Sequence, residues 1–426
     1  MTAIRDDLER RLALIGEPAS RHVFTLLYPE AARVAADAAD ARRRAGLSLG
    51  PLDGAIVSIK DLFDVAGEPT TAGSAIRRKA APAERDAPVV ARLRRAGAVI
   101  IGKTNMSEFA FSGLGLNPHW GTPGNAADPS LVPGGSSSGA GVSAALGTSD
   151  IAIGTDTGGS VRIPASYCGV FGIRPSWGAV SLTGARALGP AFDTCGWFAR
   201  SARLLRLAGE ALLPLESHGS EALGPVMKAQ SVWINAEPAT AAALLPAFEV
   251  LEHVVGLGVA VRVEGYPGIL DRTYEAFRCI QAQEAWATLG SWIEATNPGF
   301  GPGVGERFAA AKAMDPLKAA EGRHFRARFS QRLRSILAGG GVFAYPTSPI
   351  PAPLLSASQV EQDAVRQRSM GVTAIAGLVG LCEVSIPAGQ VNGAPVGLSL
   401  VAGPGRDRAL LALAERVSQA LGLEGA

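Results

Sequence analysis

The chain has 426 residues, of which 47% are hydrophobic and 18% are charged. This composition supplies enough apolar surface for a large core and excludes a generally disordered chain. The 40 Lys and Arg residues nearly balance the 38 Asp and Glu residues, and no stretch gathers the basic side chains that a nucleic-acid or anionic membrane surface requires. We therefore expect neither nucleic acid nor a membrane as a partner.

Residues that commonly bind metals or form disulfides are scattered. The four cysteines contain no Cys-x-x-Cys pair and the five histidines no His-x-x-x-His pair: Cys168, Cys195, Cys279, Cys382, His22, His119, His218, His253 and His324. The sequence thus predicts no disulfide framework, no metal site and no cofactor. Residues 1–7 lack the basic and then apolar order of a signal peptide, so we expect a cytoplasmic protein.

The first hundred residues predict helices followed by strands. Residues 1–50 place apolar side chains at helical spacing and continue with an Ala/Arg-rich stretch. Residues 54–60 alternate as a strand does, and this strand ends in Lys60. Asp86 is expected to cap a helix that Gly97 closes, before residues 98–101 return to a strand.

Small residues dominate the middle of the chain. Glycine, which makes up 52 of the 426 residues, is concentrated in residues 132–159 together with Ser, Thr and Ala, and no Lys or Arg lies between Lys103 and Arg162. We expect a buried, tightly packed segment here, with a small-residue helix at 138–147.

The remaining elements predict an α/β fold. Short strands are expected at residues 151–154, 170–173, 343–345, 383–386 and 396–402, followed by a C-terminal helix. Strands that alternate with helices over most of a chain favour one large α/β sheet. Residues 201–340 do not continue this alternation of strands and helices. We expect a variable helical portion there that covers the active site.

Two short motifs suggest other chemistries. Residues 97–104 (GAVIIGKT) have the spacing of a P-loop, but Ala-Val-Ile-Ile favours a buried strand over a phosphate-binding loop. Residues 135–139 (GSSSG) fit the nucleophile elbow of α/β-hydrolases, which would make Ser137 the nucleophile. The preceding Pro-Gly-Gly is a poor strand and none of the later histidines lies in an evident catalytic setting, so this interpretation stays open as the less favoured alternative.

Three segments carry a more specific pattern. They are residues 54–61 (GAIVSIKD), 133–139 (PGGSSSG) and 154–162 (GTDTGGSVR). In order and spacing they resemble the amidase signature family of serine hydrolases, and smaller blocks agree at residues 96–109, 192–200 and 386–398. The resemblance implies a single amidase domain over residues 1–426, built on a large, mixed and twisted β-sheet flanked by helices.

The resemblance also implies three catalytic residues. Ser160 is the nucleophile, Ser136, which lies 24 residues earlier, relays its proton, and Lys60 is the terminal base. A lysine serves as a base only when it is neutral, and burial at the end of an apolar strand favours the neutral form. Ser137 is expected to support the relay by hydrogen bonding, and the family implies a cis peptide bond between Gly135 and Ser136.

The residues before the nucleophile predict an oxyanion hole. Thr157, Gly158 and Gly159 offer successive backbone N–H groups with little side-chain obstruction. Such donors stabilise the tetrahedral intermediate of amide cleavage.

Arg162 has two interpretations. In extended backbone it would share a face with Ser160 and reach a substrate carboxylate. It would otherwise form a structural ion pair with a carboxylate such as Asp156, and we favour this second interpretation. Asp61 and Asp156 are expected to anchor the structure and not to act as acids or bases.

The expected function is hydrolysis of the C–N amide bond of a small, non-peptide substrate through an acyl-enzyme on Ser160. The expected partner is thus a small-molecule amide, and a homodimer is compatible with the sequence. The alternative is the glutamine-hydrolysing subunit of an aminoacyl-tRNA amidotransferase complex, which resembles the same family. A non-catalytic scaffold is disfavoured because all three reactive positions are present.

Overall fold

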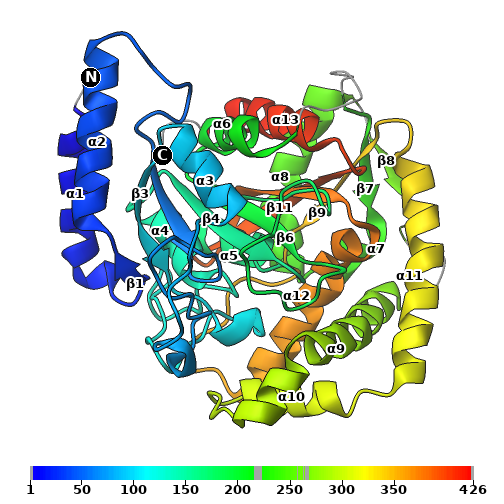
Figure 1. The fold of residues 1–426 in the computed structure, drawn as a ribbon. Helices are drawn as coiled ribbons and strands as arrows, with labels where there is room; N and C mark the ends of the chain where they lie inside the picture. Colours follow the sequence, from blue (N-terminus) through cyan, green and yellow to red (C-terminus); the bar gives the residue numbers. More distant parts are fainter. Residues whose placement is uncertain (1–2, 215–222, 257, 262, 264–267, 424–426) are drawn as a thin grey trace.

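A computed structural model describes residues 3–214, 223–256, 258–261, 263 and 268–423 (Figure 1). His218, one of the five histidines considered above, lies outside the described residues.

A mixed β-sheet forms the centre of the protein. Its strands are β1 (Phe24–Leu27), β2 (Ile56–Lys60), β3 (Val99–Thr104), β4 (Ile151–Asp156), β5 (Phe171–Arg174), β6 (Thr194–Ala199), β7 (Val226–Ala229), β8 (Val259–Val261), β9 (Val342–Pro346), β10 (Cys382–Val391) and β11 (Ala394–Ala402). Within the described residues these 11 strands follow the order β1-β3-β2-β4-β6-β5-β10-β11-β9-β7-β8. β2 pairs in parallel with β3 and β4, and β7 pairs in parallel with β8 and β9. The other pairs are antiparallel.

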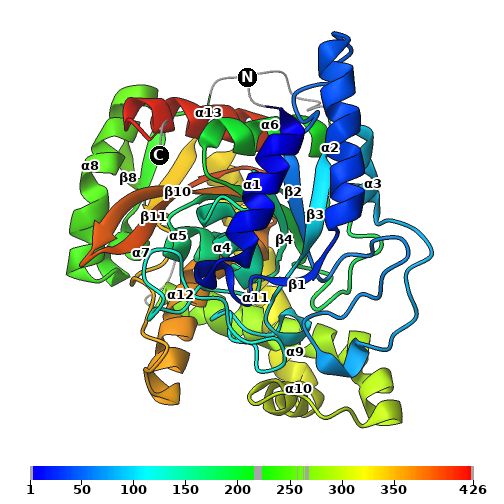
Figure 2. The same cartoon turned by 90° about the vertical axis from the view of Figure 1, so that its left-hand side faces the viewer.

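Helices cover both faces of this sheet (Figures 1 and 2). They are α1 (Ile4–Gly16), α2 (Pro29–Arg44), α3 (Pro88–Arg95), α4 (Ser138–Ala145), α5 (Arg162–Cys168), α6 (Ala202–Leu212), α7 (Gln230–Asn235), α8 (Pro238–Val255), α9 (Ile269–Thr296), α10 (Val304–Lys312), α11 (Pro316–Leu337), α12 (Gln359–Val379) and α13 (Asp407–Ala420). α8 and α13 contact each other and the strands β10 and β11, whereas α4 contacts β2 and β4, and α5 contacts both α4 and α12. The predicted fold class, a large mixed sheet flanked by helices, is confirmed.

The central position of β2 determines where the site forms. All five residues of β2 are buried, as expected for a strand covered on both faces. Because β2 and β4 run parallel, with Ile59 opposite Ile153, their carboxyl ends meet at one edge of the sheet. Lys60 therefore lies beside the glycine-rich turn that follows β4.

Four strands were missed by the sequence analysis. β6 is buried at all six positions and so has no polar alternation that would reveal a strand. β1, β7 and β8 have only three or four residues each. Since β7 and β8 fall within residues 201–340, the expectation that this interval is helical was wrong in part.

Asp86 does not cap α3, contrary to the prediction. The residue that precedes α3 is Ala87, and no side chain caps this helix. The Asp86 carboxylate instead accepts a hydrogen bond from the Ala66 backbone N–H at 2.8 Å and pairs with Arg94 at 2.9 Å. It therefore fixes the preceding loop to the helix.

α8 is the one described helix that is long and apolar enough to cross a membrane by length and composition, with a mean hydropathy of 1.2 over 18 residues. It packs on β10 and β11 and buries residues such as Leu244, Phe248 and Leu251. Core helices of soluble proteins pass the same test, so this composition is weak evidence for a membrane span.

Candidate active site

Lys60 lies at the centre of a buried cluster of hydroxyl groups. Its side chain is fully buried, and its Nζ donates hydrogen bonds to Ser136 Oγ at 2.8 Å, Ser137 Oγ at 2.9 Å and Thr155 Oγ1 at 2.7 Å. All three acceptors are uncharged. The lysine thus has full hydrogen bonding without a carboxylate in direct contact to hold its charge.

The environment of Lys60 favours the neutral amine. Burial lowers its pKa from 10.5 to about 7, and the negative charges of Asp156 and Asp193 oppose this shift only in part. At neutral pH a substantial fraction of the protein therefore carries a neutral lysine that is able to accept a proton. The predicted cause, desolvation, is the largest one.

Ser136 and Ser137 lie in the loop that precedes α4. The peptide bond between Gly135 and Ser136 is cis, as the family resemblance implied. Gly134 has a φ of +74°, and a Cβ atom there would lie 2.8 Å from the Cα atom of Pro164, so this position requires glycine. Ser137 Oγ donates to the Thr155 carbonyl at 3.1 Å, which fastens this loop to the end of β4.

Ser160 lies in the turn between β4 and α5, and 8% of it is exposed. The Ser137 N–H donates to the Ser160 carbonyl at 3.3 Å, so the two serine loops touch. The structure records no hydrogen bond between the hydroxyls of Ser136 and Ser160. The hydrogen bond between Lys60 and Ser136 in the predicted relay is therefore present, whereas the one between Ser136 and Ser160 is not.

Asp156 organises the turn that carries Ser160. Its carboxylate accepts from the N–H groups of Gly159 at 2.9 Å and Val161 at 3.1 Å, and it pairs with Arg162 at 2.8 Å and Arg174 at 3.0 Å. Burial opposes the ionised form, but the two guanidinium groups hold the pKa of Asp156 well below its usual range. Asp156 is thus a structural anchor.

The predicted oxyanion hole needs one correction. The Gly159 N–H is directed to Asp156, so it is not available to bind an oxyanion in this structure. Among the described residues, no acceptor is recorded for the N–H groups of Thr157, Gly158 and Ser160. Gly158 and Ser160 line the cavity beside the nucleophile, whereas Thr157 does not. The candidate oxyanion donors are therefore the N–H groups of Gly158 and Ser160.

Arg162 has the structural role that we favoured. It is fully buried, and its guanidinium donates to Asp156, to Glu383 at 2.6 Å and to the Thr373 carbonyl at 2.8 Å. These contacts leave no path to a substrate. Asp61 is also an anchor, paired with Lys103 at 3.1 Å.

Three members of this network were missed: Thr155, Arg174 and Glu383. Thr155 lies within the GTDTGGS segment, but no pattern in that segment indicates that its hydroxyl faces Lys60. Arg174 is the last residue of β5 and Glu383 the second residue of β10. These strands lie far apart in the sequence, so only the folded sheet brings the two residues to Asp156 and Arg162.

Ser160 borders a small cavity with a volume of about 30 Å³. This is room for one or two water molecules. The cavity is lined by Gly135 and Gly158 from the two serine loops, by Gln281 of α9, Arg307 of α10 and Arg366 of α12, and by Ala110, Phe111, Ser112, Gly113, Ile163 and Met370. A neighbouring cavity of about 200 Å³ reaches Thr155 and Thr157.

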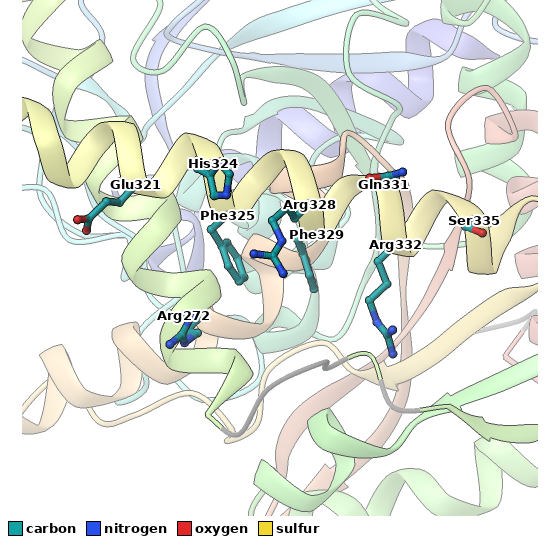
Figure 3. A pocket seen from close by; sticks show the side chains of 9 residues that line it. All are labelled: Arg272, Glu321, His324, Phe325, Arg328, Phe329, Gln331, Arg332 and Ser335. Carbon is teal, nitrogen blue, oxygen red and sulfur yellow. The ribbon is translucent and has the colours of Figure 1, made fainter.

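A much larger cavity, of about 720 Å³, lies along α11 (Figure 3). Its lining residues come from α9 and α11: Arg272, Glu321, His324, Phe325, Arg328, Phe329, Gln331, Arg332 and Ser335. None of Lys60, Ser136 and Ser160 lines it. Cavity size therefore does not locate the candidate chemistry, which lies at the buried lysine.

Among the residues that the structure describes, no group of three or more His, Cys, Asp or Glu side chains is arranged to hold a metal ion. The four cysteines are free and buried.

Comparison with known proteins identifies the family. The family model described as "Amidase" matches residues 14–240 and 249–411. The chain belongs to the amidase signature family. The chain is 37% identical over 403 residues to "Amidase 1" of Arabidopsis thaliana, across 86% of this chain and 93% of that protein. It is 32% identical over 436 residues to one subunit of the glutamyl-tRNA(Gln) amidotransferase of Chloroflexus aurantiacus, across 93% of this chain and 88% of the relative.

A solved structure described as "Crystal structure of amidase" superposes on this chain with a TM-score of 0.85 and 32% sequence identity. The superposition covers 98% of this chain and 96% of that one. The predicted family is therefore confirmed, together with its fold.

Proposed function

We propose that this amidase hydrolyses the C–N amide bond of a small, non-peptide substrate through an acyl-enzyme on Ser160. The observation that carries the proposal is the buried Lys60, whose pKa is lowered to about 7 and whose Nζ lies 2.8 Å from Ser136 Oγ. A neutral amine in contact with a hydroxyl is able to act as a general base near neutral pH.

The proposed reaction begins with attack of Ser160 Oγ on the substrate carbonyl. The Ser160 proton moves to Ser136, whose own proton moves to neutral Lys60. The N–H groups of Gly158 and Ser160 stabilise the negatively charged oxygen of the tetrahedral intermediate. Lys60 then returns a proton through Ser136 to the departing nitrogen, which leaves as ammonia or an amine.

Water completes the cycle by the same route. It attacks the acyl-enzyme, gives a proton through Ser136 to Lys60, and the acid leaves as Ser160 regains its proton. The relay requires a hydrogen bond between the two serine hydroxyls, and we expect it to close when substrate binds, because catalytic hydrogen bonds are often long before the substrate complex forms.

The proposal requires no metal ion. Hydrolysis by the purified chain should continue unchanged after dialysis against EDTA. Loss of activity that zinc restores would contradict it.

A second candidate function is the glutamine-hydrolysing subunit of an aminoacyl-tRNA amidotransferase, which the similarity to the Chloroflexus aurantiacus amidotransferase supports. Incubation of the purified chain alone with simple amides separates the two. Turnover without a partner supports the small-molecule amidase, whereas glutamine hydrolysis that appears only with partner proteins and tRNA supports the alternative.

A further inference from the structure

The cavity beside Ser160 carries positive charge. Arg307 of α10 and Arg366 of α12 both line it, and no lining residue is an Asp or a Glu. Their helices belong to different parts of the chain, so the fold brings two guanidinium groups to the nucleophile from separate elements. Arg162, which the sequence suggested for such a role, is fully engaged elsewhere.

The polar groups in this cavity have unused hydrogen-bonding capacity. No residue that the structure describes is recorded as accepting a hydrogen bond from the half-buried Arg307 guanidinium. The same holds for the amide of Gln281, although only 7% of that residue is exposed. Arg366 donates from Nε to Asp363 at 3.2 Å and directs one further nitrogen at the Met370 sulfur at 3.9 Å, so it keeps donors for another acceptor.

Two features of this cavity favour an anion in it. Two like charges in a confined space repel each other, and the donors described above have no acceptor in the described part of the chain. Burial, and after it the charge of Arg366, lowers the pKa of Arg307. A carboxylate would offset the repulsion and accept from these donors, because guanidinium groups bind its two oxygens in matching geometry.

We propose that the substrate is an anionic amide that carries a carboxylate beyond its scissile bond. Arg307 and Arg366 bind this carboxylate, and Gln281 donates a hydrogen bond to the substrate from its amide. The small volume of the cavity favours a planar carboxylate group over a larger tetrahedral anion. This inference rests on the proposed function, since it names the substrate class of the same site.

A matched pair of amides tests the proposal. Succinamate and succinamide differ only in a carboxylate against a second carboxamide, so the ratio of their kcat/KM values isolates the charge. We expect the wild type to prefer succinamate. In Arg307→Met and Arg366→Met this ratio should fall by about 10- to 100-fold, the range typical of a lost hydrogen bond to a charged group.

Arg368 supplies the control. It lies on α12 with Arg366 but is exposed and pairs with Glu237 at 3.3 Å. Arg368→Met should leave the ratio unchanged. Equal use of the two amides by the wild type, or an unchanged ratio in both cavity variants, would overturn the proposal.

A binding measurement separates this proposal from the proposed function. Calorimetry with the Ser160→Ala protein should show binding of succinamate that is lost when Arg307→Met is added. Absence of binding to Ser160→Ala contradicts the carboxylate site. Acylation of the wild type by the neutral ester p-nitrophenyl acetate tests the nucleophile alone, so its failure would reject the proposed function and leave the binding result to stand by itself.

Discussion

Replacement of Lys60 probes the base of the proposed mechanism. With a pKa of about 7, about half of the protein carries a neutral lysine at pH 7, whereas at the ordinary value of 10.5 the neutral share is roughly 1 in 3,000. Burial therefore increases the amount of usable base by about three orders of magnitude. Lys60→Met should slow acylation by about 10²–10⁴, the usual contribution of a positioned general base.

The pH dependence gives the sign of the effect. The neutral, reactive lysine exists above its pKa, so the acylation rate of the wild type should rise with pH, pass its midpoint near 7 and level off above about 8. Lys60→Met should lose this rising limb. Lys60→Arg should remain inactive across the range, because its guanidinium stays protonated.

The assay is the single-turnover release of p-nitrophenol from p-nitrophenyl acetate, followed from pH 5.5 to 9 with enzyme in excess. A Lys60→Arg protein with a near-native rate would refute the role of the lysine. A wild-type rate that is still rising steeply at pH 9, without levelling off, would refute the desolvation argument.

The same lysine makes the stability of the fold depend on pH. Its folded pKa of about 7 lies below the unfolded value of 10.5, so the unfolded chain binds more protons between these values. The free energy of unfolding should therefore gain about 1.4 kcal/mol per pH unit from this group between pH 7 and 10.5. Denaturant titration at pH 7 and pH 9 should show this gain in the wild type, while Lys60→Met lacks it. The same change in the free energy of unfolding between pH 7 and pH 9 in both proteins would contradict the burial of the amine.

Three further substitutions test the rest of the site. Asp156→Asn should lower the free energy of unfolding by about 3–5 kcal/mol, because it removes the negative charge that pairs with two buried guanidinium groups. A loss below about 1 kcal/mol in a denaturant titration would argue against the role of Asp156 as an anchor. Gly159→Val should lower kcat/KM by about 100-fold. Gly159 has a φ of +122°, and a Cβ atom there would lie 2.6 Å from Thr373 Oγ1, so the side chain would displace the turn that carries Ser160. Near-native turnover would show that the turn tolerates the change. Ser136→Ala should be less damaging than Ser160→Ala, because water is able to replace a proton relay but not the nucleophile, and the opposite order of rates would reverse the two assignments.

The resemblance to the amidase signature family assigned Lys60, Ser136 and Ser160 to one site, and the structure brings Lys60 and Ser136 into contact. Lys60 ends an apolar strand, and Ser136 and Ser160 lie in glycine-rich turns that must approach other backbone closely. Burial of the lysine follows from such local patterns, since a strand with apolar residues on both faces is a central strand.

The remainder depends on contacts between distant segments. Glu383 reaches Arg162 only because β10 pairs with β5, and Arg307 and Arg366 meet only because α10 and α12 both approach the Ser160 turn. The hydrophobic periodicity of a single segment does not indicate contacts of this kind. The sequence also could not predict that the Gly159 N–H donates to Asp156, because this depends on the conformation of a single turn.

Mass spectrometry of the intact protein tests the central claim most directly. After brief exposure to p-nitrophenyl acetate and rapid acid quench, the wild type should gain the mass of one acetyl group, and peptide mapping should place it on Ser160. Ser160→Ala should gain none. An adduct on Ser137, or an unmodified wild type that still hydrolyses amides, would contradict the acyl-enzyme on Ser160.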